Sequence, residues 1–213
     1  MAHIRLRPVA ESDLAAVLAI NEQSVPHVNS VSLDTMRRFA SCAGYFRVAT
    51  VDEAVVGFLI GLTRDTPYDS PNFLTFRRWF PEFVYVDRIA VAQSARVGGV
   101  GRALYDDVER FATALAPLLT CEVNLRPPDP DSLAFHRRMG FSQVGTQQTD
   151  GGRKTVALLM KRVGDSRDRR RTPFALADPA RSLRSSRRGG LPPRDTCGET
   201  AIGCSQGDSR ENH

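Results

Sequence analysis

The segment of this sequence best suited to bind an anion is a glycine-rich turn that joins a predicted strand to a predicted helix. The strand covers residues 83–91, and the helix pattern covers residues 102–116. The first amide groups of a helix have no partner within it and carry a partial positive charge, and glycines let the main chain approach an anion closely. A phosphate or pyrophosphate is therefore the expected ligand of residues 96–102.

The residues that follow these glycines exclude two common phosphate-binding motifs. The P-loop requires Lys and then Ser or Thr after its last glycine, whereas Arg102 and Ala103 stand at these positions. The dinucleotide-binding pattern requires a third glycine where Leu104 stands. The remaining motif is Arg96-x-x-Gly99-x-Gly, directly after a strand that ends in Ile-Ala-Val.

Strands and helices alternate around this turn. Alternating polar and apolar residues predict strands, and apolar residues three and four apart predict helices. The predicted strands cover residues 3–7, 45–51, 54–62, 83–91, 118–125, 141–147 and 155–161, and the predicted helices cover residues 12–25, 32–43, 102–116 and 131–139. This order predicts an α/β fold in which a mixed sheet has helices on its faces.

A long loop is predicted over residues 63–82. It carries five aromatic side chains: Tyr68, Phe73, Phe76, Trp79 and Phe80. Loops of this length are usually functional or disordered, and the aromatic residues argue against disorder. Two interpretations remain open, namely a satellite of the hydrophobic core packed over the sheet and a lid over a substrate.

Two motifs resemble those of the GNAT superfamily of N-acetyltransferases. Arg96, Gly99 and Gly101 match the three fixed positions of that family's Q/R-x-x-G-x-G/A signature. Residues 129–141 are similar to the family's helix with the pattern N-x-x-S…Y-x-x-x-G-F. The resemblance covers residues 3–163 and implies a twisted, mostly antiparallel sheet flanked by helices on both faces.

The resemblance also implies acetyl-coenzyme A (acetyl-CoA) as the cofactor and acyl donor. Amide groups of the glycine turn would hold its pyrophosphate, and the main chain of the preceding strand would pair with its pantetheine arm and polarise the thioester carbonyl. Asp129 stands where the family commonly has Asn, and we expect it to cap the following helix. The candidate cofactor-binding residues are Ile89, Ala90, Val91, Arg96, Val97, Gly98, Gly99, Val100, Gly101, Arg102, Asp129 and Ser132.

Acetyl transfer to an amine uses an acid for the leaving thiolate and a base for the amine. The resemblance implies Tyr as the acid on the helix over residues 131–139, but His136 stands at that position. An imidazolium, with an ordinary pKa of about 6.5, can donate a proton to a thiolate. His136 is therefore a catalytic candidate, with Tyr105 and His27 as weaker alternatives. The other interpretation is a histidine without a role in proton transfer.

Asp87 is the candidate base, and Glu82 is second to it. Strict alternation along the strand places four residues on one face: Tyr85, Asp87, Ile89 and Val91. Tyr85 is the remaining catalytic candidate. The resemblance supports a carboxylate on this strand as the group that takes the amine proton. The alternative is an ion pair between Asp87 and Arg88 that only satisfies a half-buried strand.

The chain of 213 residues divides near residue 163. Residues 1–163 carry 19 Lys and Arg and 17 Asp and Glu, whereas residues 164–213 carry 10 Arg and 7 acidic residues. With five Leu, Ile, Val or Phe residues, the second segment cannot bury enough apolar surface to offset the entropy lost on ordering. We therefore expect an acetyltransferase domain over residues 1–163 and a disordered, Arg-rich tail over residues 164–213.

Composition excludes several other classes of protein. The four scattered cysteines form no C-x-x-C pair, so no metal site is expected and a reducing compartment is the default. No apolar run approaches the ~18 residues that span a membrane, and the N-terminal residues lack the apolar segment of a secretory signal. We expect a cytoplasmic protein with no membrane partner.

The expected function is transfer of an acetyl group from acetyl-CoA to a primary amine of a small molecule or protein. Two other classes stay open. A catalytically silent acyl-CoA-binding module or sensor is favoured by the missing Tyr at position 136. Nucleic-acid binding through the Arg-rich tail is less favoured, because the body of the chain is nearly balanced in charge. The resemblance is compatible with a homodimer.

Overall fold

The computed structural model describes residues 3–96 and 98–164. Within them, the strands form a single sheet in the order β1-β2-β3-β4-β5-β7-β6. The strands are β1 (Arg5–Pro8), β2 (Tyr45–Val51), β3 (Ala54–Thr63), β4 (Val84–Val91), β5 (Leu118–Arg126), β6 (Ser142–Thr149) and β7 (Lys154–Arg162). Neighbouring strands are antiparallel except β4 and β5, which are parallel. The predicted mixed, mostly antiparallel sheet is confirmed.

Two predictions fall outside the described residues. One is the contact of Val97 with the cofactor. The other is the disorder of the Arg-rich tail, of which the structure describes Gly164 alone.

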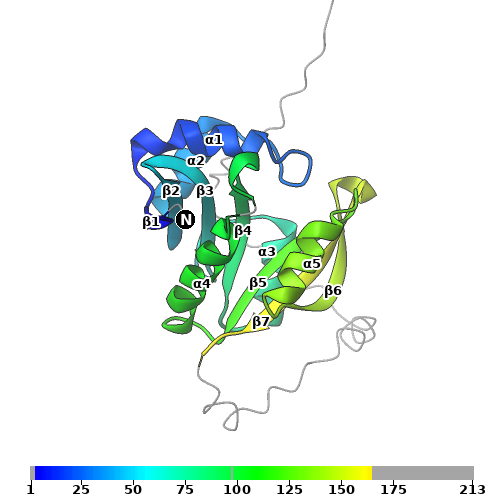
Figure 1. Ribbon diagram of the computed structural model, residues 1–213. Coiled ribbons are helices and arrows are strands. Elements are labelled where there is room, and N and C mark those ends of the chain that lie inside the picture. The colour runs from blue at the N-terminus through cyan, green and yellow to red at the C-terminus, as the bar shows by residue number, and fades with distance from the viewer. Residues whose placement is uncertain (1–2, 97, 165–213) are drawn as a thin grey trace, which may run out of the picture. The chain divides into compact units, whose positions relative to one another are not determined.

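Helices cover both faces of the sheet, as predicted (Figure 1). The helices are α1 (Leu14–Glu22), α2 (Leu33–Cys42), α3 (Pro71–Trp79), α4 (Val100–Thr113) and α5 (Pro130–Arg138). Helices α1, α2 and α3 share one hydrophobic core with one face, and α4 and α5 share a second core with the other. Within the described part of the chain, no helix combines the length and apolar character needed to cross a membrane.

Helix α3 lies where a loop is predicted, so that prediction is wrong over Pro71–Trp79. Phe73, Phe76 and Phe80 follow helical spacing and are 0–6% exposed. Pro71 occupies the first helical turn, where its missing amide proton costs nothing. Phe73, Phe76 and Phe80 therefore belong to the core rather than to a lid, and they hold α3 against the sheet.

A β-bulge interrupts the regular pairing of β4. Ile60 on β3 lies opposite Arg88, while the next residue, Gly61, lies opposite Val86. Asp87 is therefore an extra residue on β4 with no partner across the ladder. A bulge of this kind places two consecutive side chains on the same face and increases the local twist of the strand.

The bulge changes which side chains share a face of β4. Tyr85 packs in the core under α1–α3, whereas Ile89 and Val91 pack with the core under α4 and α5. Arg88 lies on the same face as Tyr85, with its guanidinium over an aromatic ring of α2. The strict alternation predicted for this strand is therefore wrong for Ile89 and Val91, since it does not allow for an inserted residue at Asp87.

Strands β4 and β5 pair over three residues and then separate (Figure 1). The last paired residues are Val86 and Cys121, yet β4 continues to Val91 and β5 to Arg126. Main-chain groups of both strands therefore face each other without a ladder between them. The separation leaves a slot through the sheet, next to the N-terminal end of α4.

Candidate active site

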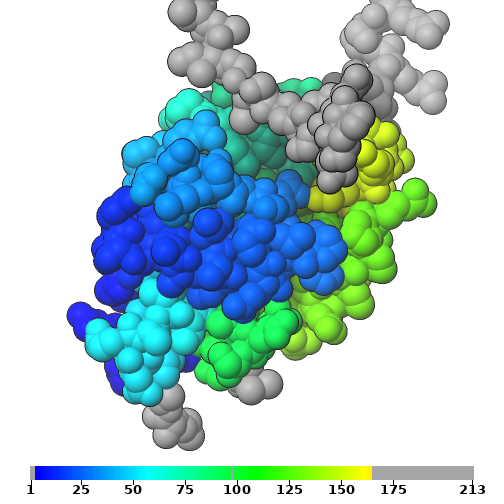
Figure 2. Space-filling view, turned by 90° about the horizontal axis from the view of Figure 1, so that it is seen from above, coloured from blue at the N-terminus to red at the C-terminus, as the bar shows by residue number. Residues whose placement is uncertain are grey.

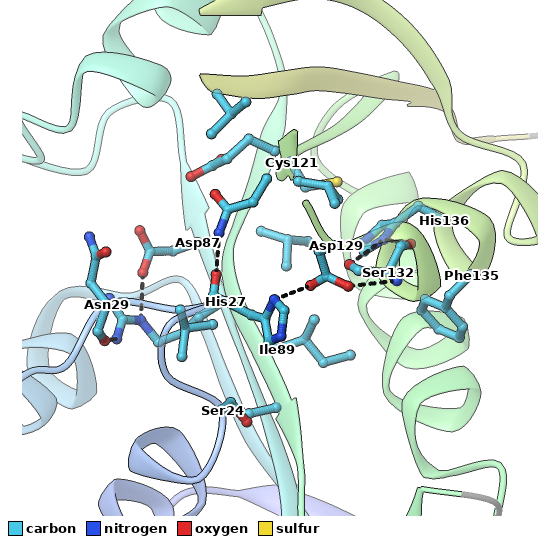
Figure 3. A pocket seen from close by; sticks show the side chains of 18 of the residues that line it. Ser24, His27, Asn29, Asp87, Ile89, Cys121, Asp129, Ser132, Phe135 and His136 are labelled. Atoms are coloured by element: carbon cyan, nitrogen blue, oxygen red, sulfur yellow. Dashed lines mark hydrogen bonds and ion pairs between the residues drawn. The ribbon is translucent and has the colours of Figure 1, made fainter. Parts of the chain in front are cut away.

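A cavity of about 640 Å³ occupies the slot between β4 and β5. Residues from both layers of helices line it, including Phe135 and His136 on the side of α4 and α5 and His27 and Asn29 on the side of α1–α3 (Figure 3). Gly101 and Asn72 also line it. The cavity thus passes through the sheet and connects its two faces. A group that enters from one face can meet a group that enters from the other.

The N-terminal end of α4 opens onto this cavity. Gly99 precedes the helix with φ of +78°, a left-handed conformation that glycine adopts without strain. The amide of Ala103 donates to the carbonyl of Gly99, the first such bond of the helix. The amides of Val100, Gly101 and Arg102 therefore have no acceptor within the helix and suit an anion.

The other residues of the turn differ in whether they can contact the predicted anion. Gly98 donates its amide to the carbonyl of Ala95 at 3.1 Å, which disfavours the predicted contact of this amide with an anion. Arg96 lines the cavity, and its Nε approaches the carbonyl of Val91 at 3.5 Å. The residues that suit an anion are therefore fewer than residues 96–102, and the amides without an acceptor in the helix lie in the first turn of α4.

The end of β4 has an open main-chain edge. Ile89, Ala90 and Val91 pair with β3 on one side. On the side of β5, no strand of the described chain pairs with them. This is the arrangement required for a ligand that adds to the strand through main-chain hydrogen bonds.

Asp129 caps α5 and also binds the segment between α1 and α2. Its Oδ1 accepts the amide of Ser132 at 3.0 Å, so the expected cap is confirmed. Its Oδ2 pairs with Nδ1 of His27 at 3.0 Å (Figure 3). Both acceptor atoms of the carboxylate are thus occupied by protein groups, whereas the predicted contacts of Asp129 and Ser132 with a cofactor stay predictions.

His136 is buried between α4 and α5, with both ring nitrogens bound. Nδ1 lies 2.7 Å from the carbonyl of Ser132, which can only accept, so Nδ1 carries the proton. Nε2 lies 2.6 Å from the hydroxyl of Tyr105, which therefore donates to it. Burial lowers the pKa of His136, and the Ser132 carbonyl opposes this in part. The geometry disfavours the predicted acid role, because a neutral imidazole bound in this way has no proton to give to the cavity.

Replacing His136 by Phe should lower the unfolding free energy by about 1–3 kcal/mol near neutral pH, because the Tyr105 hydroxyl loses its acceptor. The loss should shrink as the pH falls below about 6.5. A histidine whose folded-state pKa is depressed contributes stability that is present above its ordinary pKa and is lost on acidification, and Phe has no such dependence. Urea unfolding at several pH values measures the difference; an equal loss at all pH values would contradict a buried neutral His136.

Asp87 and Arg88 form an ion pair at the wall of the cavity. Nε of Arg88 lies 2.9 Å from Oδ2 of Asp87, and the two side chains are 8% and 4% exposed. A second nitrogen of Arg88 donates to Oδ1 of Asn21 at 3.0 Å. The ion-pair alternative is therefore the observed arrangement. It argues against Asp87 as the base, since its charge is already compensated by a neighbour.

Glu122 on β5 is a titratable residue of the cavity that the sequence interpretation missed. Its two carboxylate oxygens accept hydrogen bonds from Tyr85 (2.6 Å) and from Asn72 (3.0 Å). Burial raises the pKa of Glu122 to about 7, although both hydrogen bonds act in the opposite direction. A carboxyl with this pKa exchanges a proton readily at neutral pH.

Tyr85 supports Glu122 rather than facing the cavity. It is fully buried and is not among the residues that line the cavity. Burial, followed by the neighbouring Glu122 carboxylate, raises its pKa well above the ordinary value. Tyr85 therefore contacts Glu122 rather than the cavity, and its predicted catalytic role stays a prediction. A lone acid in the apolar strand Leu118–Arg126 is the signal that could have identified Glu122.

The segment between α1 and α2 reaches across the cavity on the side of α1–α3. The carbonyl of His27 accepts from Nδ2 of Asn124 on β5 at 3.0 Å, and Asn29 accepts from Lys154 at the start of β7. Figure 2 shows this segment in blue against the light green of the α5 region and the yellow of β7. This segment therefore covers the cavity on the side of α1–α3.

A sequence model of the acetyltransferase (GNAT) family matches residues 16–141. The matched segment includes the glycine turn, both strands of the slot and most of the cavity wall. Among curated protein sequences, none matches this chain.

Many solved structures share the fold. Ard1 from Thermoplasma volcanium is 18% identical, with a TM-score of 0.61 over 75% of this chain and 97% of that one. Naa20 from Chaetomium thermophilum, solved with a bisubstrate analogue, is 20% identical, with a TM-score of 0.58 over 75% and 86%. The ribosomal-protein-S18-alanine N-acetyltransferase of Escherichia coli is 16% identical, with a TM-score of 0.56 over 77% and 96%. At these identities the likeness concerns the fold.

Proposed function

Because this chain belongs to the acetyltransferase (GNAT) family, we propose that it transfers the acetyl group of acetyl-CoA to a primary amine of a small molecule or protein. The observation that carries the proposal is Glu122, a carboxyl with a pKa of about 7 at a cavity that crosses the sheet beside an anion-binding helix end. One face of the sheet receives the acyl donor, and the other receives the amine.

The residues on the α4 side fit the donor. The amides of Val100, Gly101 and Arg102, which have no acceptor within the helix, suit its pyrophosphate, and the open edge of Ile89–Val91 suits its pantetheine arm. Acetyl-CoA supplies an acetyl thioester, the bond that the amine must break. An amide of the open β4 edge polarises the thioester carbonyl as charge develops on its oxygen.

Glu122 acts as the base on the other face. The amine reaches the cavity mainly as an ammonium ion, and Glu122 takes one of its protons to leave a nucleophilic lone pair. The new C–N bond forms as the C–S bond breaks, and the proton that the nitrogen then releases balances the charge of the leaving thiolate. Tyr85 and Asn72 hold the Glu122 carboxylate in place through this exchange.

A silent acyl-CoA-binding module is the second candidate function. The observation in its favour is His136, which stands where the family helix has Tyr and is bound on both nitrogens in its neutral form. Such a module requires the same donor site but no turnover. It therefore differs from the enzyme in one measurable respect, the release of free CoA thiol in the presence of an amine.

Acetyl-CoA should raise the melting temperature, and ATP should not. At about 100 times its Kd, a ligand of the folded state adds about 2.7 kcal/mol of stability. A panel of amino acid amides, short peptides and diamines, with detection of free thiol, then tests transfer. Binding with turnover supports the enzyme, and binding without turnover on the whole panel supports the silent module. Stabilisation by ATP but not by acetyl-CoA would overturn both.

A further inference from the structure

The two edge strands of the sheet differ in how well they are protected against pairing with another chain. An exposed strand edge carries unpaired amides and carbonyls, and proteins usually protect it with charges, proline or short length. Strand β1 follows this rule, because it has four residues, ends at Pro8 and carries two arginines that pair with Asp13 and Glu53. Strand β6 has eight residues, SQVGTQQT, and none of them is charged or a proline. Of the two edges, β6 is therefore the one suited to receive a further strand.

The edge of β6 is regular over most of its length. After a register shift between Gln143 and Gly145, residues Gly145–Thr149 pair one for one with β7. Within the described part of the chain, no strand pairs with β6 on its other side. Successive residues of a strand direct their amides to opposite edges, so every second residue of this stretch presents its amide and carbonyl to the outside. An extended peptide can complete the ladder there through main-chain hydrogen bonds.

A groove of about 530 Å³ lies beside this edge, on the face of the sheet that α3 covers. Among the described residues, β6 is the only strand that lines it, through Gln147, whose Oε1 accepts from Thr75 at 2.6 Å. A strand added to β6 would direct every second side chain into this groove, where Leu74 is 37% exposed. Helix α3 contributes one stripe with helical spacing and a neighbouring arginine: Pro71, Leu74, Thr75, Arg78 and Arg77. We call this surface the α3–β6 groove.

The charge of the α3–β6 groove is positive. Arg77 and Arg78 are exposed, and neither forms an ion pair with a carboxylate of the described residues. Neither α3 nor β6 contains an acidic residue. Antiparallel pairing of β6 with β6 of a second copy would place both α3 helices on the same face and bring two arginines to two arginines. A strand with carboxylates on its groove side complements this charge, whereas a second copy does not.

We infer that the α3–β6 groove is a docking site for an extended, acidic segment of a partner protein, which adds to the sheet beside β6 and pairs its carboxylates with Arg77 and Arg78. A nucleic acid can match the charge, but it has no main-chain amides with which to complete the ladder. Among the described residues, Pro71 alone lines both this groove and the active-site cavity. The inference is therefore independent of the proposed function.

Two capped peptides of eight residues form a matched pair of probes. Glu alternates with Thr in the first, and Gln alternates with Thr in the second, so that they differ in charge but hardly in shape. NMR of the main-chain amides of the full-length protein follows chemical shifts and hydrogen exchange. We expect the Glu–Thr peptide to cause saturable shifts in α3 and β6 and to slow exchange at alternate amides of Gly145–Thr149, without effect on β1. Equal binding of the two peptides, or no slowing of exchange in β6, would overturn the inference.

The double variant Arg77→Gln/Arg78→Gln should bind the Glu–Thr peptide about fivefold more weakly or worse, the effect of losing two partly exposed ion pairs. Arg137→Gln/Arg138→Gln is the matched control, because these arginines are also consecutive and exposed in the last turn of a helix but do not line the groove. The control should bind within about twofold of the unaltered protein. An equal loss in both variants would assign the effect to net charge and contradict a docking site.

The same measurements identify any other occupant of the edge. Slow exchange of alternate amides in Gly145–Thr149 without any peptide would show that the edge is already covered by this chain or by a second copy, and sedimentation distinguishes the two. A single-stranded oligothymidylate that displaces the Glu–Thr peptide and binds the full-length protein more tightly would assign the arginines to nucleic acid. Each of these outcomes would overturn the inference. Fast exchange without peptide and slow exchange with the Glu–Thr peptide support it.

Discussion

Replacing Glu122 by glutamine should lower kcat/KM for amine acetylation by about a hundredfold to ten-thousandfold, the range expected for loss of a general base. Glutamine keeps the shape of the side chain and can still accept from Tyr85, but it cannot take a proton. The fold should therefore persist, and the loss should appear in the rate rather than in acetyl-CoA affinity. Steady-state kinetics with free-thiol detection, together with calorimetric titration of acetyl-CoA, measures the two quantities.

The pH dependence gives a second readout for the same variant. In the unaltered enzyme kcat/KM should rise with pH through about 7, because Glu122 accepts a proton only when it is ionised. The Glu122→Gln variant should lose this rise in kcat/KM near pH 7. It should keep the change in kcat/KM at higher pH that arises from ionisation of the amine. Asp87→Asn is the matched control and should retain the rise, moved to lower pH because the Asp87 charge contributes to the raised pKa of Glu122. A rise that persists in Glu122→Gln and vanishes in Asp87→Asn would return the base role to Asp87.

Replacing Gly101 by leucine should weaken acetyl-CoA binding by about a hundredfold or more. A Cβ at this position would lie 3.5 Å from Phe135 and 3.9 Å from Val91, between α5 and the open edge of β4. The rest of a leucine side chain would therefore fill the slot and displace a ligand from the helix amides. Two lost charge-assisted hydrogen bonds of about 1.5–3 kcal/mol each correspond to this change or more. Calorimetric titration measures the affinity.

Gly98→Ala is the control for this substitution. A Cβ at Gly98 would meet the carbonyl of Ala95 at 3.4 Å, an ordinary contact, and Gly98 does not line the cavity. Acetyl-CoA affinity should therefore stay within about threefold of its normal value, as expected for a surface change of under 1 kcal/mol. If Gly101→Leu bound acetyl-CoA as well as Gly98→Ala does, the donor would have to lie elsewhere.

Periodicity in the sequence was sufficient for most of the fold. Regular strands and helices expose their spacing in the order of polar and apolar residues, and α4 shows this plainly, with buried residues at Val100, Leu104, Val108 and Ala112. Helix α3 was not predicted, because its short helical pattern is surrounded by Pro, Asp and Ser residues that are typical of loops. Its tertiary contacts, rather than its propensity, decide that Pro71–Trp79 is helical.

The anion-binding turn was also readable in the sequence, because its chemistry comes from the main chain over a few consecutive residues. Gly99 and Gly101 mark where the backbone must turn and approach a ligand. The acid–base groups were not readable in the same way. Asp87 and His136 occupy suggestive positions in motifs, yet their partners, Arg88 and Tyr105, leave neither free for the predicted proton transfer.

The sequence by itself determined the order of the elements other than helix α3, the sheet with helices on both faces and the helix end that suits a diphosphate, since each depends on residues close together in the chain. Only the tertiary structure decided which side chains meet in the slot. The bulge at Asp87 changes the face of β4 on which Ile89 and Val91 lie. The separation of β4 from β5 opens the sheet. Glu122 and Asn72, 50 residues apart, then meet at the wall of the cavity, where burial raises the pKa of Glu122 and the Asn72 oxygen has no donor within the described part of the chain.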